Sequence, residues 1–180
     1  MSAPRIRDAD PARDAAACAA IYAPYITDGV ASFEARPPDA EEIARRMRAA
    51  HVWLVAELGE QVIGYAYGSR HAERAAYRWA ADVAVYLDAR HHRAGVGRAL
   101  YGVLLPRLRD LGYWRAYGGV TVPNAASDGL HRATGFTEVG VYRRIGYKHG
   151  AWHDVRWWQL DLRPGEDGPP AEPVTASAHA

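Results

Sequence analysis

One segment in the middle of the chain restricts the fold more than any other. An apolar strand candidate at residues 80–87 leads through a basic turn and two glycines into an amphipathic helix, and the turn reads DARHHRAGVG from Asp88 to Gly97. At a helix N-terminus the first amides lack helical partners, the dipole adds positive potential, and glycine lets a ligand approach the backbone. Arg93 and Arg98 add full charges. The segment predicts either an anion site suited to a pyrophosphate or a plain helix start with surface arginines.

Two common nucleotide-binding motifs do not fit this turn. A P-loop needs a Lys followed by Ser or Thr, and the turn contains no such pair. A dinucleotide-binding turn needs a third glycine, but Gly95-Val96-Gly97 is followed by Leu100 at that position. The turn is therefore typical of neither class.

Strand and helix signals alternate along the rest of the chain. Two Asp-capped helices are expected, one from Asp10 to about Tyr22 and one opening at Asp39. The early strands and the last strands read as antiparallel hairpins, whereas a strand–helix–strand unit lies between them. An α/β protein with a mixed sheet is expected, with strands at 4–8, 52–57, 61–70, 80–87, 114–122, 136–146 and 152–162, and further helices at 95–111 and 124–134.

Composition narrows the class of protein. The 180 residues suit one domain, and 49% hydrophobic with 24% charged residues exclude a chain disordered throughout. The net charge of +1 gives no excess for nucleic acid or an anionic membrane, and no apolar stretch is long enough to cross a bilayer. Cys18 is the only cysteine, and the charged N-terminus does not resemble a signal peptide, so a cytoplasmic protein is expected. Residues 163–180, with four of the eleven prolines, are expected to form a flexible tail after a domain at 1–162.

The turn resembles the (Gln/Arg)-x-x-Gly-x-(Gly/Ala) motif of GNAT acetyltransferases, which grips the pyrophosphate of acetyl-CoA. Here the motif starts at His92, where the family has Gln or Arg. Further segments are similar to the phosphinothricin N-acetyltransferase branch over about residues 4–162. They are Trp53-Leu54-Val55-Ala56-Glu57, Ala76-Tyr77-x-Trp79, Val85-Tyr86, Leu100-Tyr101, Pro123-Asn124, Lys148-His149-Gly150-x-Trp152-His153-Asp154 and Trp158-Gln159-Leu160-Asp161.

The resemblance implies a GNAT fold and a place for the acetyl donor. The sheet would be mixed and mostly antiparallel, with about six or seven strands, helices on both faces and a central splayed parallel pair at 80–87 and 114–122. Acetyl-CoA would lie in the gap between that pair, where strand amides can pair with its pantetheine arm. Asn124 could equally be only a turn residue and N-cap. The implied cofactor-binding residues are Val85, Tyr86, Leu87, Arg93, Ala94, Gly95, Val96, Gly97, Arg98 and Asn124.

The resemblance also implies two catalytic candidates. Asp82 stands where the branch has a Glu proposed as the base, and the shorter Asp favours a bridging water. His131 stands where many GNAT enzymes have a Tyr that donates to the departing thiolate. Without the resemblance, Asp82 would be an ordinary strand acid and His131 a surface residue of an amphipathic helix. Which of them is the principal base stays open. Cys18 is expected to be a core residue, so transfer would be direct.

The resemblance further implies an acceptor site around a loop before the central strands. Arg74 would pair an acceptor carboxylate, Tyr77 would wall the site, and Phe33-Glu34 would lie in a covering loop. Ala75 and Ala76 complete the candidate set. Arg74 could also be a solvated loop charge.

The acceptor implied is a primary amine of a small amino-acid-like molecule, such as phosphinothricin or methionine sulfoximine. A protein N-terminus or a polyamine as acceptor, or a non-catalytic acyl-CoA-binding module, are the alternatives. No metal is expected: His149 and His153 have a zinc-like spacing, but HExxH is absent and Gly150 indicates a turn. The branch is commonly dimeric, so a homodimer is expected.

Overall fold

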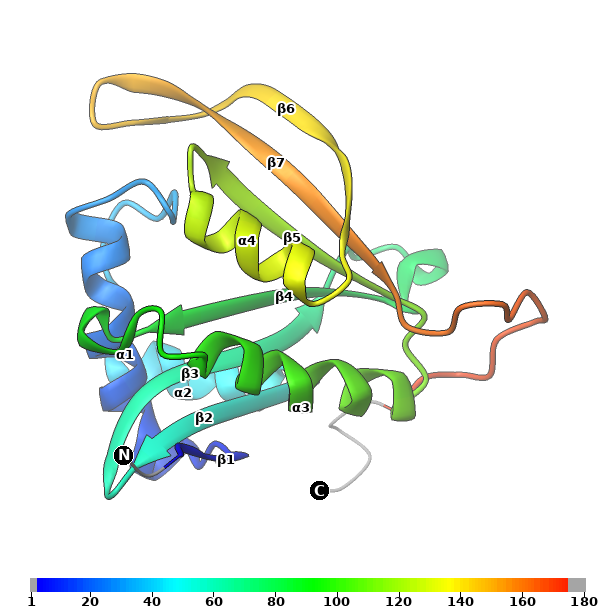
Figure 1. The fold of residues 1–180 in the computed structure, drawn as a ribbon, viewed down its shortest axis with the longest axis horizontal. Helices are drawn as coiled ribbons and strands as arrows, with labels where there is room; N and C mark the ends of the chain where they lie inside the picture. The colour runs from blue at the N-terminus through cyan, green and yellow to red at the C-terminus, as the bar shows by residue number, and fades with distance from the viewer. Residues whose placement is uncertain (1–2, 175–180) are drawn as a thin grey trace.

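Seven strands form one sheet in the order β1-β2-β3-β4-β5-β7-β6 in the computed structural model, which describes residues 3–174 (Figure 1). Every neighbouring pair is antiparallel except β4 and β5, which are parallel. This confirms the mixed, mostly antiparallel sheet with one central parallel pair. The strands are β1 Arg5–Asp8, β2 Val52–Leu58, β3 Gln61–Arg70, β4 Ala80–Leu87, β5 Arg115–Val122, β6 Thr137–Lys148 and β7 Ala151–Asp161.

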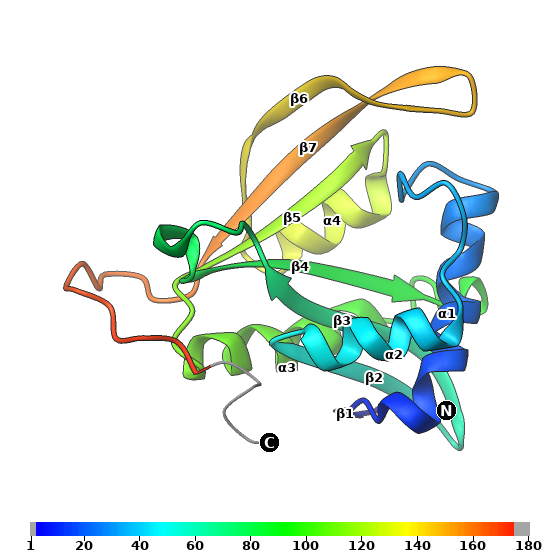
Figure 2. The ribbon, with the colours of Figure 1, turned by 180° about the vertical axis from the view of Figure 1, so that it is seen from behind.

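Within residues 3–174, four α-helices cover the two faces of the sheet. Two pack on one face and two on the other, as the opposite views of Figures 1 and 2 show. Short 3-10 turns at Ala75–Tyr77 and Ala89–His91 flank β4 on either side. The helices are α1 Pro11–Thr27 and α2 Ala40–Ala49 on one face, and α3 Val96–Asp110 and α4 Ala125–Ala133 on the other.

Helix α1 is longer than the sequence indicates. It continues past Tyr22 to Thr27, with Pro24 inside its last turns. Proline removes one helical hydrogen bond but its carbonyl still accepts, and the amide of Asp28 donates to Pro24 O at 3.0 Å. Ile26, 2% exposed, anchors the final turn in the core. Burial of that side chain offsets part of the cost of the proline.

Alternating side chains divide the core into two layers. Along β2, Leu54 and Ala56 pack with α3, whereas Trp53 and Val55 pack with α1 and α2. The same alternation along β4 sends Ala81 and Val83 toward α3. It therefore places the side chains of Asp82, Ala84 and Tyr86 on the α1–α2 face.

Strands β4 and β5 pair only at their start. The parallel register joins Ala80 to Arg115, Ala81 to Ala116 and Asp82 to Tyr117, and no later pair exists in the described chain. Beyond Asp82 the two strands diverge, which Figure 1 shows as a V that opens toward α1. The expected splayed pair is confirmed, and its closed end lies at Asp82.

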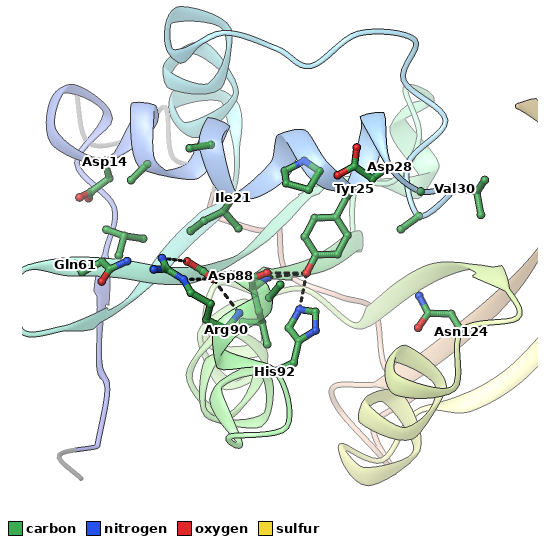
Figure 3. A pocket seen from close by; sticks show the side chains of 18 of the residues that line it. Asp14, Ile21, Tyr25, Asp28, Val30, Gln61, Asp88, Arg90, His92 and Asn124 are labelled. Atoms are coloured by element: carbon green, nitrogen blue, oxygen red, sulfur yellow. Dashed lines mark hydrogen bonds and ion pairs between the residues drawn. The ribbon is translucent and has the colours of Figure 1, made fainter. Parts of the chain in front are cut away.

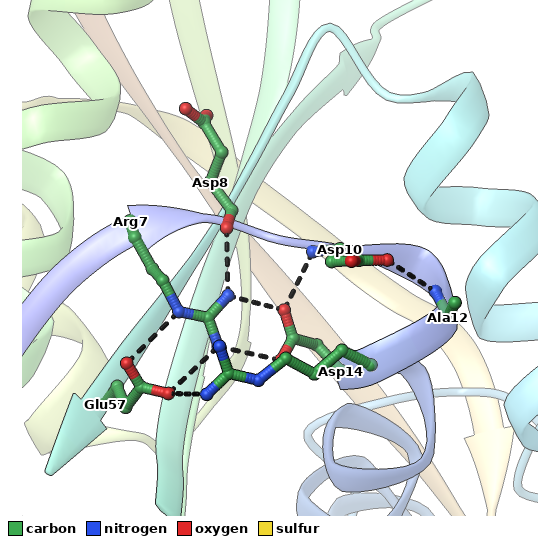
Figure 4. Close-up of polar contacts among 7 residues, drawn as sticks. Arg7, Asp8, Asp10, Ala12, Asp14 and Glu57 are labelled. Carbon is green, nitrogen blue, oxygen red and sulfur yellow. Dashed lines mark hydrogen bonds and ion pairs between the residues drawn. The ribbon is translucent and has the colours of Figure 1, made fainter. Parts of the chain in front are cut away.

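A buried charge network ties the N-terminal strand to α1 and β2 (Figure 4). Arg7 donates to both carboxylate oxygens of Asp14, at 2.7 and 2.8 Å, and to Glu57 at 3.2 Å. Arg13 adds a further ion pair to Glu57. The backbone amide of Asp10 also donates to Asp14, at 2.8 Å. These partners offset the cost of burying Asp14, whose side chain is 1% exposed.

The tip of the β6–β7 hairpin reaches the loop between α1 and α2. Lys148 Nζ donates to the carbonyl oxygens of Ile26 and Ser32, each at 2.7 Å. Phe33 packs on His153 with ring centroids 6.2 Å apart. The turn at His149 and Gly150 that the glycine indicates is confirmed.

Residues 163–174 follow β7 in a loop that projects outward and returns to the body of the protein at residues 171–174 (Figure 1). Arg78 forms an ion pair with Glu172 at 2.7 Å, and the indole of Trp79 donates to Ala171 O at 2.8 Å. The amide of Val174 donates to Leu111 O at 2.8 Å. The remainder of the tail expected from the sequence, residues 175–180, lies outside the described residues.

Candidate active site

A groove of about 920 Å³ opens beside α1 and leads into the gap between β4 and β5 (Figure 3). A narrower slot of about 90 Å³ continues between the two strands. Tyr25, Ala31, Thr121 and Asn124 line both cavities, so the slot opens into the groove. The deep end of the slot meets His131 and Tyr101 on the α3–α4 face. An elongated ligand can therefore enter along α1 and cross the sheet between its splayed strands.

The main chain of β4 offers polar groups to this gap. The N–H and C=O of one strand residue point to the same side, and successive residues alternate. Asp88 N donates toward β3, to Ile63 O at 2.9 Å, so Leu87 and Val85 point the other way, into the gap. By the same alternation the main chain of Tyr86 faces β3. Its side chain is packed between Tyr22 and Tyr25, at ring distances of 4.6 and 5.1 Å.

The hydroxyl of Tyr25 binds the main chain at the end of β4 that faces the gap. It donates to Leu87 O at 2.7 Å and accepts from Leu87 N at 3.3 Å (Figure 3). The same oxygen lies 3.0 Å from Nε2 of His92. His92, the first position of the glycine motif, is thus linked to α1 through Tyr25. A ligand that pairs with Leu87 must displace this hydroxyl.

The glycine turn forms the N-terminus of α3. The first helical bond runs from Ala99 N to Gly95 O, which leaves the amides of Val96, Gly97 and Arg98 ahead of it without helical partners. Gly95 is left-handed at φ 78°, and a Cβ there would meet open space. Arg93 also has a left-handed φ, and Ala94 is exposed between them.

Two arginines border these amides. The side chains of Arg93 and Arg98 are exposed and form no hydrogen bond or ion pair with the described residues. Free amides, a helix dipole and two unpaired guanidinium groups suit a pyrophosphate. Asn124 has a local role as well, because its side chain accepts from Ser127 N at 3.1 Å and caps α4.

Asp82 lies at the closed end of the gap, one residue before the slot lining begins at Val83. Its Oδ1 is 2.6 Å from Nδ1 of His71, which follows β3. Burial raises the pKa of Asp82 above its usual value, and the hydrogen bond with His71 opposes part of that rise. The carboxyl group is therefore held in a partly dehydrated position with one defined partner.

His131 lies on the opposite face of the sheet, buried at 4% exposure. Nδ1 is 2.8 Å from Ser127 O, and a carbonyl only accepts, so Nδ1 carries hydrogen. In the neutral ring Nε2 then accepts, and the Tyr101 hydroxyl lies 3.4 Å from it. Burial lowers the pKa of His131, which favours this neutral form. His131 must gain a proton at Nε2 before it can donate one there.

The residues expected to bind the acceptor lie in two places, the 3-10 turn before β4 and the loop between α1 and α2. Tyr77 lies beside His71, with ring centroids 6.3 Å apart. Arg74, Ala75 and Ala76 are exposed in the adjoining 3-10 turn, and Arg74 has no side-chain partner among residues 3–174. In the loop between α1 and α2, by contrast, the side chain of Glu34 is already bound by an arginine. Hydrogen bonds from Arg46, at 2.7 and 3.1 Å, lower the pKa of Glu34 despite its partial burial.

His71 and Lys148 lie in this region, although no sequence pattern marks either of them as a site residue. His71 is near Asp82 only because the β3–β4 register pairs Ser69 with Asp82. Lys148 belongs to the Lys148-His149-Gly150 segment, which is similar to the family, but the similarity alone implies no function for this lysine. Cys18 is fully buried, and burial raises the pKa of its thiol to about 12. A thiol in that state is not a nucleophile.

Comparison with known proteins agrees with this geometry. The model of the acetyltransferase (GNAT) domain matches residues 8–157. The phosphinothricin N-acetyltransferase of Streptomyces viridochromogenes is 37% identical over 91% of each chain. The methionine sulfoximine/methionine sulfone acetyltransferase of Pseudomonas aeruginosa is 31% identical over 91% of this chain and 98% of its own.

Solved structures give the same result. The phosphinothricin acetyltransferase of Sinorhizobium meliloti in complex with acetyl-CoA has a TM-score of 0.89, with 33% identity over 96% of each chain. An acetyltransferase from Salmonella typhimurium with its cofactor acetyl-CoA has a TM-score of 0.85, with 30% identity over 92% of this chain and 98% of that one. The chain belongs to the GNAT family of acetyltransferases. Within the family it is similar to enzymes that acetylate amino-acid-like compounds.

Residues 3–174 include no helix long and apolar enough to span a bilayer. The same residues bring together no group of three or more His, Cys, Asp or Glu side chains that could hold a metal ion.

Proposed function

We propose that this protein transfers acetyl from acetyl-CoA to the primary amine of a small amino-acid-like acceptor, such as phosphinothricin or methionine sulfoximine. The single observation that carries the proposal is the slot between β4 and β5, with Asp82 at its closed end and His131 at its α4 side. A thioester arm lying in that slot would place its carbonyl between two groups that can move protons.

The donor would be held along its length by this chain's main chain. Val85 and Leu87 would pair with the amides of the pantetheine arm, as an added strand would. The amides of Val96, Gly97 and Arg98, with the charges of Arg93 and Arg98, would hold the pyrophosphate. Asn124 would contact the arm while it caps α4. Gly95 leaves room for this approach because a Cβ at this position would point into open space.

The acceptor would lie on the α1–α2 face, against Asp82. Arg74 would pair its carboxylate, Tyr77 would wall the site, and Phe33 and Glu34 would cover it with their loop. An acceptor amine is mostly protonated at neutral pH and must lose a proton before it attacks. The Asp82 centre would remove that proton, and His131, once protonated, would donate to the departing sulfur.

We further propose that the protein acts in the cytoplasm as a homodimer and binds neither nucleic acid nor membranes. Exposed apolar side chains at the β6 edge of the sheet support the proposed dimer. The β6–β7 hairpin exposes large apolar side chains there, at Val139, Tyr142, Ile145, Tyr147 and Trp152. A near-neutral net charge supports the absence of polyanionic partners. Light scattering on the purified protein tests the dimer.

A thiol-release screen tests the function. The purified protein is incubated with acetyl-CoA and glutamate analogues, the common amino acids, a polyamine and short peptides. We expect release with phosphinothricin or methionine sulfoximine at a kcat/KM at least about tenfold above that for the peptides or the polyamine. Release only with peptides or the polyamine would contradict the proposed acceptor, and binding of acetyl-CoA without release would indicate a non-catalytic module.

A further inference from the structure

His71 and Asp82 form a closely bonded pair at the closed end of the gap. Nδ1 of His71 lies 2.6 Å from Oδ1 of Asp82. Because an ionised carboxylate only accepts, Nδ1 carries the hydrogen of this bond, and Nε2 of the neutral ring keeps a free lone pair. Nε2 forms no hydrogen bond with any residue in the described range and is not enclosed. The side chain of His71 is 27% exposed, so a small ligand can reach this nitrogen.

Aromatic side chains from three elements fix the orientation of the imidazole. Tyr117 on β5 stacks on it, with centroids 4.6 Å apart and planes at 24°. Trp157 on β7 meets it edge-on at 6.2 Å, and Tyr77 in the 3-10 turn does so at 6.3 Å. The titratable groups facing the ring are thus Asp82, Tyr117 and Tyr77. With Nδ1 bonded to Asp82, the arrangement leaves Nε2 as the reactive end.

The chemistry of the reaction favours imidazole over a carboxylate as the proton acceptor. A carboxylic acid ordinarily titrates near 4, an imidazole near 6.5 and an alkyl ammonium near 10. Proton transfer is most efficient when the acceptor titrates close to the operating pH. A carboxylate behind an imidazole fixes its tautomer and stabilises the imidazolium that forms. Asp82 is placed for that supporting role, since its hydrogen bond is to the ring.

We propose that His71 is the proton acceptor of the acetyl transfer and that Asp82 acts through it. Nε2 of His71 takes a proton from the protonated acceptor amine, which frees the lone pair of its nitrogen. That lone pair attacks the thioester carbon, the C–N bond forms and the C–S bond breaks. Sulfur leaves with the bonding electron pair and takes the second proton that the nitrogen loses, which gives free CoA thiol, and the imidazolium of His71 then returns its proton to solvent. This assignment rests on the acetyl transfer proposed above.

The test compares His71→Asn, His71→Ala and wild type as full-length proteins. Asn keeps an amide donor where Nδ1 stands, and so keeps the bond to Asp82, but it has no nitrogen that accepts a proton. Thiol release is followed from pH 6 to 10 with methionine sulfoximine and phosphinothricin. Acetyl-CoA affinity is measured by calorimetry and folding by circular dichroism. We expect His71→Asn to bind acetyl-CoA like wild type and to lose about 10²-fold in kcat at pH 7.

Two further results would support the assignment. The defect of His71→Asn should shrink at alkaline pH, where solution supplies neutral amine, and added imidazole should restore part of the activity of His71→Ala. Wild-type kcat in His71→Asn would overturn the assignment, and so would a pH-independent loss without imidazole rescue, which marks a positioning residue. Either outcome in an otherwise active enzyme leaves the proposed function intact. A folded wild type that binds acetyl-CoA but acetylates neither acceptor overturns both.

Discussion

The Nε2 atom of His131 occupies the space that a side chain at Gly118 would need. A Cβ built on Gly118 would lie 2.3 Å from that nitrogen and 3.0 Å from Cδ2 of the same ring. The ring is itself confined by Trp158, stacked at 5.9 Å, and by Phe136, edge-on at 5.0 Å. Gly118 therefore has a steric role that its backbone conformation does not require.

Gly118→Ala should displace the His131 ring and strain its packing against Trp158 and Phe136. Overpacking of this kind costs about 1–3 kcal/mol of unfolding free energy. Gly119→Ala is the matched control, because its Cβ would approach Trp157 no closer than 3.4 Å, an ordinary contact. Denaturant unfolding of both variants measures the difference. Equal stability of the two would show that the His131 ring can move aside freely.

Gly95→Glu should weaken acetyl-CoA binding. The carboxylate would stand beside the unpaired amides of α3 and repel a pyrophosphate, and the left-handed φ adds about 1–2 kcal/mol of strain. Gly165→Glu introduces the same charge at a similar φ, 83° against 78°, in the segment after β7. Calorimetry should show at least about a tenfold loss of affinity, roughly 1.4 kcal/mol, for Gly95→Glu alone. Unchanged affinity in a folded Gly95→Glu would place the pyrophosphate elsewhere.

Arg74→Ala should raise the KM for an amino-acid acceptor and leave the KM for acetyl-CoA nearly unchanged. A hydrogen-bonded charge pair is worth about 1.5–3 kcal/mol. Arg78→Ala is the control, since that guanidinium is already paired with Glu172 and lies 4.8 Å over the ring of Trp79. Steady-state kinetics with both substrates decides the point. If both constants move together, the carboxylate is bound by another residue.

Asp14→Asn should destabilise the fold at neutral pH by about 3–5 kcal/mol, because Arg7 loses a buried carboxylate partner. Burial alone would raise the pKa of Asp14, but hydrogen bonds from Arg7 and the Asp10 amide hold it below its usual value. A lowered folded pKa means that the carboxylate stabilises the protein above its unfolded pKa and loses that effect as pH falls through the folded pKa.

The difference between wild type and Asp14→Asn should accordingly narrow toward strongly acidic pH. Asp10→Asn is the control, because Asn caps a helix about as well as Asp does. Urea unfolding at a series of pH values measures both variants. A difference between wild type and Asp14→Asn that stays constant with pH would show that the charge of Asp14 is not the source of its stabilising effect.

Helices and strands whose boundaries are set by neighbouring residues could be predicted from the sequence. Strand β4 begins and ends where the apolar run predicts, and α2 begins after its Asp39 cap, whose side chain accepts from Glu42 N at 2.9 Å. The end of α1 could not, because Pro24 is a helix breaker locally and the turn beyond it is held by tertiary contacts, the burial of Ile26 and the hydrogen bond from Lys148 to the Ile26 carbonyl. Local patterns do not record that kind of tertiary burial.

The candidate site divides in the same way. The Gly95 turn is contiguous in sequence, so its backbone geometry follows from its own residues. The bond between His71 and Asp82 depends on how β3 and β4 are aligned, and a shift of one residue would send Asp82 to the other face. Register of this kind is set by the whole sheet, so His71 carries no local signal of its role.

Lys148 also determines when the loop after α1 can be held in place. Its two carbonyl partners, on Ile26 and Ser32, are 122 and 116 residues earlier in the chain. During synthesis from the N-terminus, the loop after α1 therefore emerges long before the amine that secures it. The nascent chain can pack both faces of its first strands while the loop after α1 still lacks the hydrogen bonds from Lys148. We expect the loop after α1 to reach its final position only after the β6–β7 hairpin has been synthesised.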